Sequence, residues 1–227
     1  MNITLLLLIA ILPGILIALY FYLRDLREPE PTGLIWVNIL FGIVSFFISR
    51  GLGFLLHQFI YTGHEDRMQQ LLIALIFIGL LGEGSKFLFL RGFTFYYKSF
   101  NQPFDGIVYA IMVGMGYAIA ENVFYAINVD TLPDTLRMFT VVPANAVFAV
   151  IMGYFLGEAK LFKTRIFMYS LLALVVPVVA HGYYDYFLDA VNIRGLWMEG
   201  IVSLLIVGML SQIAIRKRKA ENLRKFE

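Results

Sequence analysis

Long apolar runs separated by short polar segments dominate this chain of 227 residues. Most runs reach about twenty residues, the length that a helix needs to cross the hydrocarbon of a bilayer. The pattern therefore predicts an all-α fold, a polytopic membrane helical bundle with about seven transmembrane helices. The expected spans are 3–23, 34–60, 68–90, 104–128, 138–159, 166–188 and 197–215.

Composition agrees with a membrane protein and narrows its chemistry. Hydrophobic residues make up 60% of the chain, more than the half that is usual for a soluble domain. The chain contains no cysteine, which excludes disulfides and thiolate chemistry. We expect one membrane domain over 1–227, with a core at about 68–188 and a basic tail at 216–227. No feature indicates nucleic acid or a nucleotide as a partner.

The first and second apolar runs carry two further expectations. The first run has no positively charged segment before it and no small-residue cleavage site, so we expect a retained helix. The second is long and could break near Arg50-Gly51.

The distribution of basic residues predicts the orientation. Alternate loops fall on the same side of the membrane, and thirteen basic residues share one side with the C-terminal tail. They are Arg24, Arg27, Arg91, Lys98, Lys160, Lys163, Arg165, Arg216, Lys217, Arg218, Lys219, Arg224 and Lys225. The opposite side holds only Arg67, Arg137 and Arg194. Because basic loops stay in the cytoplasm, we expect a multi-pass protein of the cell membrane with its N-terminus outside and its C-terminus cytoplasmic.

The fourth span combines a smooth face with a carboxylate. Small residues recur at every fourth position, namely Gly106, Ala110, Gly114 and Ala118. Such a face lets a neighbouring helix approach closely. Glu121-Asn122 follows at its edge. A carboxylate inside a spanning helix costs about 2.5–3.5 kcal/mol on insertion scales, so we expect Glu121 to face the protein interior.

Three other spans carry polar groups. In the third, Glu83 and Lys86 are three residues apart and could form a buried ion pair, with Gly82 leaving room beside Glu83. In the fifth, Asn145 follows Pro143 by two residues and is expected to bond between helices.

In the sixth span, His181 and Asp185 lie four residues apart on one face. The carboxylate could therefore accept from one imidazole nitrogen and leave the other free for a cavity.

These side chains could share one polar cluster, which allows two kinds of chemistry. A carboxylate base next to a water, with histidine or asparagine to stabilise an oxyanion, is the minimum for peptide hydrolysis. Ion or proton transport uses the same residue types, although paired broken helices in two halves are not visible here. A depth estimate places Glu121, Asn145 and His181 at a similar level. It places Glu83 nearer the cytoplasm, about 12 Å from Arg91 at 1.5 Å per residue.

The motifs together resemble a known family. The series GEGSK, FDGIVYAIMVGMGYAIAENVFYA, VPANAVFAVIMGYFLG and HGYYDYF is similar to the PrsW family of intramembrane proteases, distant relatives of the CAAX-prenyl proteases. The likeness extends from about Leu71 to Phe187. It implies a peptidase that cuts a membrane-anchored protein, such as an anti-sigma factor, on its outer side.

The resemblance also implies roles for particular residues. It makes Glu83, Glu121, His181 and Asp185 the catalytic candidates, with Lys86, Asn122 and Asn145 supporting them. Two positions depart from the family pattern, because Gly82 stands where a first glutamate is usual and Asn145 where a histidine is usual. Neither replacement can act as a base.

The sequence leaves more than one possibility open for both the cofactor and the activity. Either no cofactor is needed, or a zinc ion is held by Glu83, Glu121 and His181. The first hypothesis is regulated intramembrane proteolysis of a single-span membrane protein within the lipid bilayer. The second is a non-catalytic relative that binds such partners, and the third is a small ion- or proton-coupled transporter.

Overall fold

The computed structural model describes residues 3–24, 29–60, 67–102, 104–128, 132–161, 163–189, 205, 208–209 and 211–217. These residues are helical apart from short connections, which confirms the expected all-α membrane bundle. Six helical segments are long and apolar enough to cross a membrane. They are Thr4–Leu23, Thr32–Leu56, Met68–Tyr96, Asp105–Ile127, Thr140–Leu161 and Ile166–Phe187.

The six segments match the first six predicted spans. The corresponding elements are α1 (Ile3–Arg24), α2 (Thr32–Ile60), α3 (Arg67–Ile73) with η1 (Ala74–Glu83) and α4 (Gly84–Gly92), α5 (Asp105–Asn128), α6 (Leu132–Leu161) and α7 (Ile166–Asp189). Short 3₁₀ turns, η2 (Thr94–Tyr96) and η3 (Lys163–Arg165), lie in two of the connections. The seventh predicted span, 197–215, and most of the basic tail lie largely outside the described residues.

Two details differ from the expectation. The second span does not break at Arg50-Gly51, because α2 runs without interruption through both residues. The third contains a π-helical stretch, η1, which ends at Glu83. Wider turns of this kind occur often at functional sites, and their side chains do not follow the α-helical period.

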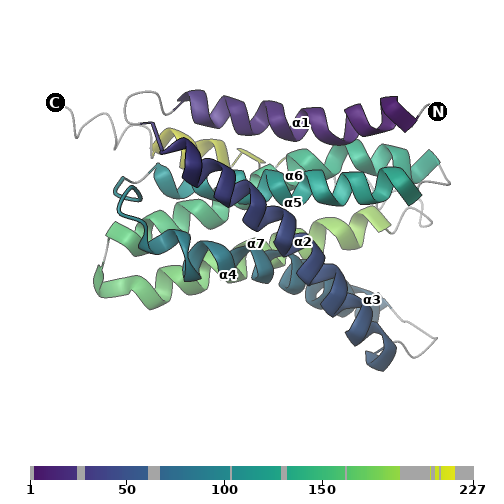
Figure 1. Ribbon diagram of the computed structural model, residues 1–227. Coiled ribbons are helices and arrows are strands. Elements are labelled where there is room, and N and C mark those ends of the chain that lie inside the picture. The colour runs from purple at the N-terminus through teal and green to yellow at the C-terminus, as the bar shows by residue number, and fades with distance from the viewer. Residues whose placement is uncertain are drawn as a thin grey trace.

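Helix α5 is the centre of the bundle. Of its membrane-spanning stretch, 72% is buried inside the bundle, against 22% for α2 and 28% for α1. Figure 1 shows α1 along one side of α5 and α6, with α4 and α7 opposite and α2 crossing obliquely. The sequence predicted that Glu121, on this helix, faces the protein interior. The central position of α5 explains why Glu121 is shielded from lipid.

Glycines let α5 approach two neighbours closely. A methyl group added at Gly106 would lie 2.4 Å from the backbone oxygen of Gly153 on α6. On another face of α5, a methyl group at Gly116 would lie 2.1 Å from the backbone oxygen of Ile39 on α2. Neither distance can accommodate a side chain, so close helix contacts hold α5 in place.

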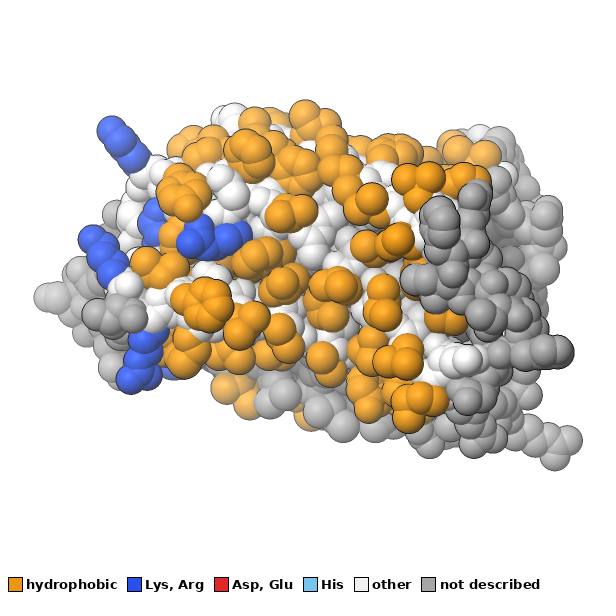
Figure 2. Space-filling model, turned by 90° about the horizontal axis from the view of Figure 1, so that it is seen from below, with side chains coloured by type: hydrophobic (Ala, Val, Ile, Leu, Met, Phe, Trp, Pro, Cys, Tyr) orange, Lys and Arg blue, Asp and Glu red, His pale blue; other side chains and the backbone are white. Residues whose placement is uncertain are grey.

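The surface has the distribution expected for contact with lipid. Large apolar side chains are exposed on most helices, among them Trp36 and Phe54 on α2 and Phe167 on α7. In Figure 2, hydrophobic side chains cover most of the visible face, and lysine and arginine gather at one end. An exposed apolar surface of this kind indicates a membrane environment.

Candidate active site

Four segments bring polar side chains together inside the bundle. Glu83 ends η1, Glu121 lies on α5, Asn145 on α6 and His181 on α7. Their exposed fractions are 0%, 9%, 1% and 4%. We call Glu83, Lys86, Glu121, Asn145 and His181 the polar cluster. The sequence placed Glu83 nearer the cytoplasm than His181, but the 2.7 Å contact between Glu83 Oε1 and His181 Nδ1 puts the two side chains at one level.

Glu83 is the hub of the polar cluster. Its Oε1 accepts a hydrogen bond from Lys86 Nζ at 2.6 Å and lies 2.7 Å from His181 Nδ1. The predicted buried ion pair is therefore present. The second oxygen, Oε2, is buried and has no hydrogen-bond partner among the described residues. A buried carboxylate oxygen normally has a partner, so this atom is available to a water or a substrate group.

Asn145 connects three of the helices. Its Oδ1 accepts from Lys86 Nζ at 2.8 Å, and its Nδ2 lies 3.4 Å from Glu121 Oε2. The same Nδ2 also donates to the Val141 backbone oxygen at 3.1 Å, one turn earlier. The expected bond between helices exists, although the shortest one uses the amide oxygen as an acceptor. The amide thus links the ammonium of Lys86 to the carboxylate of Glu121.

His181 is held differently from the expectation. Its Nε2 lies 3.8 Å from Asp185 Oδ2, which is too long for a hydrogen bond. The close partner is Glu83, on Nδ1, and the ring stacks on Phe148 with centroids 4.6 Å apart. When Nδ1–H donates to Glu83, Nε2 is left as the basic nitrogen, facing Asp185.

The remaining predicted residues lie around the polar cluster. Asn122 and Asp185 are buried, at 0% and 2% exposure. Gly82 is buried beside Glu83, and a methyl group there would lie 3.9 Å from His181 Cε1. The atom nearest to that methyl group would be Tyr117 Oη, at 3.2 Å, so a side chain at position 82 would meet the tyrosine before the histidine.

Two residues, Phe148 and Ser49, gave little signal in the sequence, whereas Tyr117 follows the polar face of its span and was a candidate to bridge the carboxylates or to mark the membrane interface. Tyr117 carries the Lys86 ammonium 4.4 Å above its ring, and its hydroxyl lies 3.0 Å from Ser49 Oγ on α2. Phe148 stacks on the histidine, and as an apolar residue of a membrane-spanning helix it gave no sign of this contact. A serine in an apolar helix often bonds its own backbone, so Ser49 alone gave no indication of a site.

The donors as arranged do not fit a metal ion. Among the described residues, no three histidine, aspartate or glutamate side chains are grouped to hold one. Lys86 Nζ already lies between Glu83 Oε1 and Asn145 Oδ1, at 2.6 and 2.8 Å. A zinc site needs at least three good protein ligands, whereas this centre holds an ammonium group.

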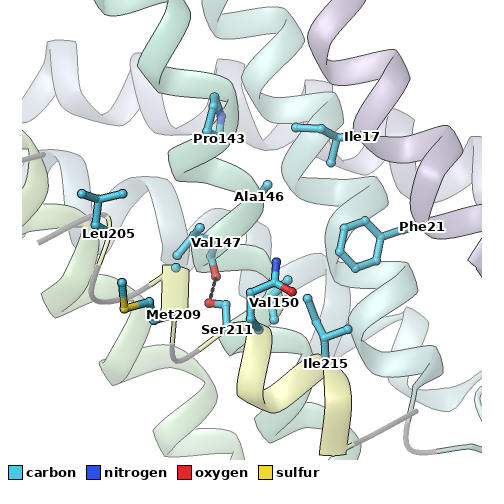
Figure 3. Close-up of a pocket in the computed structure, with 12 residues that line it drawn as sticks. Ile17, Phe21, Pro143, Ala146, Val147, Val150, Leu205, Met209, Ser211 and Ile215 are labelled. Atoms are coloured by element: carbon cyan, nitrogen blue, oxygen red, sulfur yellow. Dashed lines mark hydrogen bonds between the residues drawn. The ribbon is translucent and has the colours of Figure 1, made fainter. Parts of the chain in front are cut away.

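A separate cavity of about 490 Å³ lies outside the polar cluster. Figure 3 shows it between α1, α6 and the C-terminal segment, with Phe21, Pro143 and Met209 among its walls. Its lining is largely apolar, and Ser211 Oγ donates to the Val147 backbone oxygen at 3.4 Å. It lacks the carboxylates and imidazole that hydrolysis would require.

Comparison with known proteins supports the resemblance in the motifs. A family model described as PrsW family intramembrane metalloprotease matches residues 30–214. Protease PrsW of Bacillus subtilis (strain 168) is 31% identical over 184 residues, covering 80% of this chain and 82% of that protein. Protease PrsW of Halalkalibacterium halodurans is 30% identical over 215 residues, covering 94% and 95%.

Protease PrsW of Geobacillus kaustophilus (strain HTA426) is 30% identical over 186 residues, covering 82% of this chain and 80% of that protein. No solved structure gives a significant match. The family match covers most of the chain and includes every helix of the polar cluster. This multi-pass membrane protein therefore belongs to the PrsW family of intramembrane proteases.

Proposed function

We propose that this chain hydrolyses a peptide bond in a single-span membrane protein, such as an anti-sigma factor, with Glu83 as the general base. The observation that carries the proposal is the state of the Glu83 carboxylate. One oxygen is held by Lys86 and His181, and the other is buried without a partner among the described residues. A fixed carboxylate with one available oxygen is suited to orienting a water.

The proposed reaction uses groups already in contact. Glu83 Oε2 takes a proton from a water, whose oxygen adds to the carbonyl carbon of the peptide. The oxyanion that forms is stabilised by Asn145 Nδ2, whose contact with Glu121 Oε2 is long, at 3.4 Å, so that one N–H can turn to it. The C–N bond then breaks, and the proton held by Glu83 passes to the leaving nitrogen. Each proton and each bond is accounted for with one water consumed.

No step of this proposal passes through a metal. The family is described as a metalloprotease family, but the donors of this chain surround Lys86 rather than a space for a cation. Glu121 is a second carboxylate, joined to the polar cluster by its contact with Asn145 Nδ2. Asp185 faces Nε2 of His181. These two carboxylates have supporting roles in the proposal.

The expected orientation supports a substrate cut toward the outer side. Glu121 lies sixteen residues after Asp105, so about 24 Å along α5 at 1.5 Å per residue. With the basic loops in the cytoplasm, this depth is in the outer half of the membrane. The proposal thus includes an extracytoplasmic N-terminus and a cytoplasmic tail.

Cleavage by purified protein in liposomes tests the function. A reconstituted single-span substrate is followed by gel and mass spectrometry with the wild-type chain, Glu83→Gln and Glu158→Gln. Glu158 makes a matched control because it lies on α6 and pairs with Lys217 at 3.8 Å, outside the polar cluster. We expect the wild type and the control to cleave and Glu83→Gln to lose cleavage.

The competing hypothesis is a non-catalytic relative that binds single-span partners. It is favoured by Gly82 and by the neutral amide of Asn145, which cannot transfer a proton. In that case the substrate would co-purify intact with both the wild-type chain and Glu83→Gln. Equal cleavage by Glu83→Gln would instead remove Glu83 from the mechanism.

A further inference from the structure

Tyr117 lies in the middle of the polar groups, although it carries neither a base nor an acid of the proposed reaction. It precedes Glu121 by one turn of α5 and is 6% exposed. One face of its ring meets the Lys86 ammonium, 4.4 Å from the centroid. The ring also makes an edge contact with Phe46, with centroids 5.6 Å apart. The ring is therefore held by Phe46 of α2 on its edge and contacts the Lys86 ammonium of α4 on its face.

The hydroxyl of Tyr117 has a defined direction. Ser49 Oγ donates to the backbone oxygen of Phe46 at 2.9 Å, and a serine hydroxyl has one proton. In the 3.0 Å contact between the two hydroxyls, Tyr117 is therefore the donor. Helix α2, which contributes no charged group to the polar cluster, reaches it through this bond.

Gly82 and the Tyr117 hydroxyl compete for the same space. A methyl group on Gly82 would lie 3.2 Å from Tyr117 Oη and 3.9 Å from His181 Cε1. The first distance is tighter than an ordinary carbon–oxygen contact. The buried ring cannot easily move away, since Phe46, Ser49 and Lys86 hold it. A methyl group at position 82 would therefore press on Tyr117 Oη, whereas its distance to His181 is an ordinary contact.

We propose that Tyr117, tied to α2 by Ser49, is a positioning residue of the active site and that its hydroxyl restricts the room for a side chain at position 82. The ring sets the place of the Lys86 ammonium, and Lys86 in turn shares Glu83 Oε1 with His181. The assignment rests on the proposed function for its catalytic meaning. Its geometric part does not depend on cleavage.

A double-mutant cycle in liposomes tests the catalytic part. Tyr117→Phe keeps the ring and removes the hydroxyl, so we expect kcat to fall about tenfold with KM unchanged, which corresponds to one lost hydrogen bond. Gly82→Ala is expected to lower kcat by a similar factor through the contact with Oη. The double variant should be no slower than Tyr117→Phe, because the methyl group then meets no oxygen. Independent effects, with a double variant slowed about a hundredfold, would overturn the proposal.

A second readout separates this proposal from the proposed function. The chain has three histidines, so the imidazole NMR signals of His181 can be assigned by substitution. Tyr117→Phe should shift these signals, and Tyr109→Phe should leave them unchanged. Tyr109 is a matched control because it is a buried tyrosine of the same helix that donates to Glu30 instead. If the wild type cleaves no substrate, the proposed function is refuted, but the His181 signals still test whether Tyr117 positions the site. Unchanged His181 signals in Tyr117→Phe would refute the positioning role.

Discussion

Lys86→Met should destabilise the bundle far more than an ordinary loss of a surface charge. Lys86 is 2% exposed, and its ammonium donates to Glu83 Oε1 at 2.6 Å and to Asn145 Oδ1 at 2.8 Å. Methionine keeps the length and the apolar stem and removes the charge. It leaves Glu83 as a fully buried carboxylate whose remaining partner among the described residues is His181. Removing one partner from a buried ion pair costs about 3–5 kcal/mol.

The magnitude can be measured by thermal unfolding in detergent. A domain of 150–250 residues loses about 2–4 °C of Tm per kcal/mol, so Lys86→Met should melt about 6–20 °C below the wild type. Lys217→Met is the matched control, because Lys217 is 53% exposed and lies 3.8 Å from Glu158. Glu158 is only 8% exposed, but water screens the half-exposed Lys217 ammonium, so we expect a loss of about 0–1 kcal/mol and little change in Tm.

A third variant separates charge from packing. Lys86→Met combined with Glu83→Gln removes both charges, and should recover much of the lost stability because no uncompensated carboxylate remains. If Lys86→Met melts within about 2 °C of the wild type, a value below the range expected for this loss, the buried ammonium does not contribute to stability through its contacts with Glu83 and Asn145.

Three further predictions concern packing and the ranking of polar residues. Gly153→Ala should lower Tm strongly or prevent folding, because its methyl group would lie 2.2 Å from a backbone oxygen of α5. Gly33→Ala is the control, since no atom lies within 4 Å of its methyl group, and thermal unfolding compares the two variants. Asn145→Ala should lower the free energy of unfolding by about 1–3 kcal/mol, because the buried Lys86 ammonium then loses one of its acceptors. Denaturant unfolding measures this loss, and an unchanged free energy would contradict the contact between Lys86 and Asn145. Asp185→Asn should slow cleavage less than Glu83→Gln, because Asp185 makes no short bond to the imidazole; equal losses in a cleavage assay would restore the role predicted from the sequence.

The sequence predicted the membrane architecture because hydrocarbon thickness limits it. Six of the predicted spans coincide with the spanning helices, and α5 was correctly expected to present Glu121 to the interior. The pairing of Glu83 with Lys86 also followed from their spacing, since residues three apart share a helix face. Local periodicity was enough for all of these features.

Contacts between helices were less accessible from the sequence. The α-helical period placed Asp185 against His181, but the short bond comes from Glu83 at the end of a π-helical stretch. Sequence spacing cannot predict such a partner, because the choice depends on how η1 packs against α7. The same limit applies to Ser49, which is 68 residues from the hydroxyl it contacts.

The central claim is that Glu83 and His181 act together in one site. Single-turnover cleavage in liposomes by the wild type, Glu83→Gln, His181→Ala and the double variant tests it most directly. Residues that act as a unit show strongly non-additive losses, so the double variant should be no slower than the slower single variant. Losses that multiply, or cleavage that persists in the double variant, would contradict a shared active site.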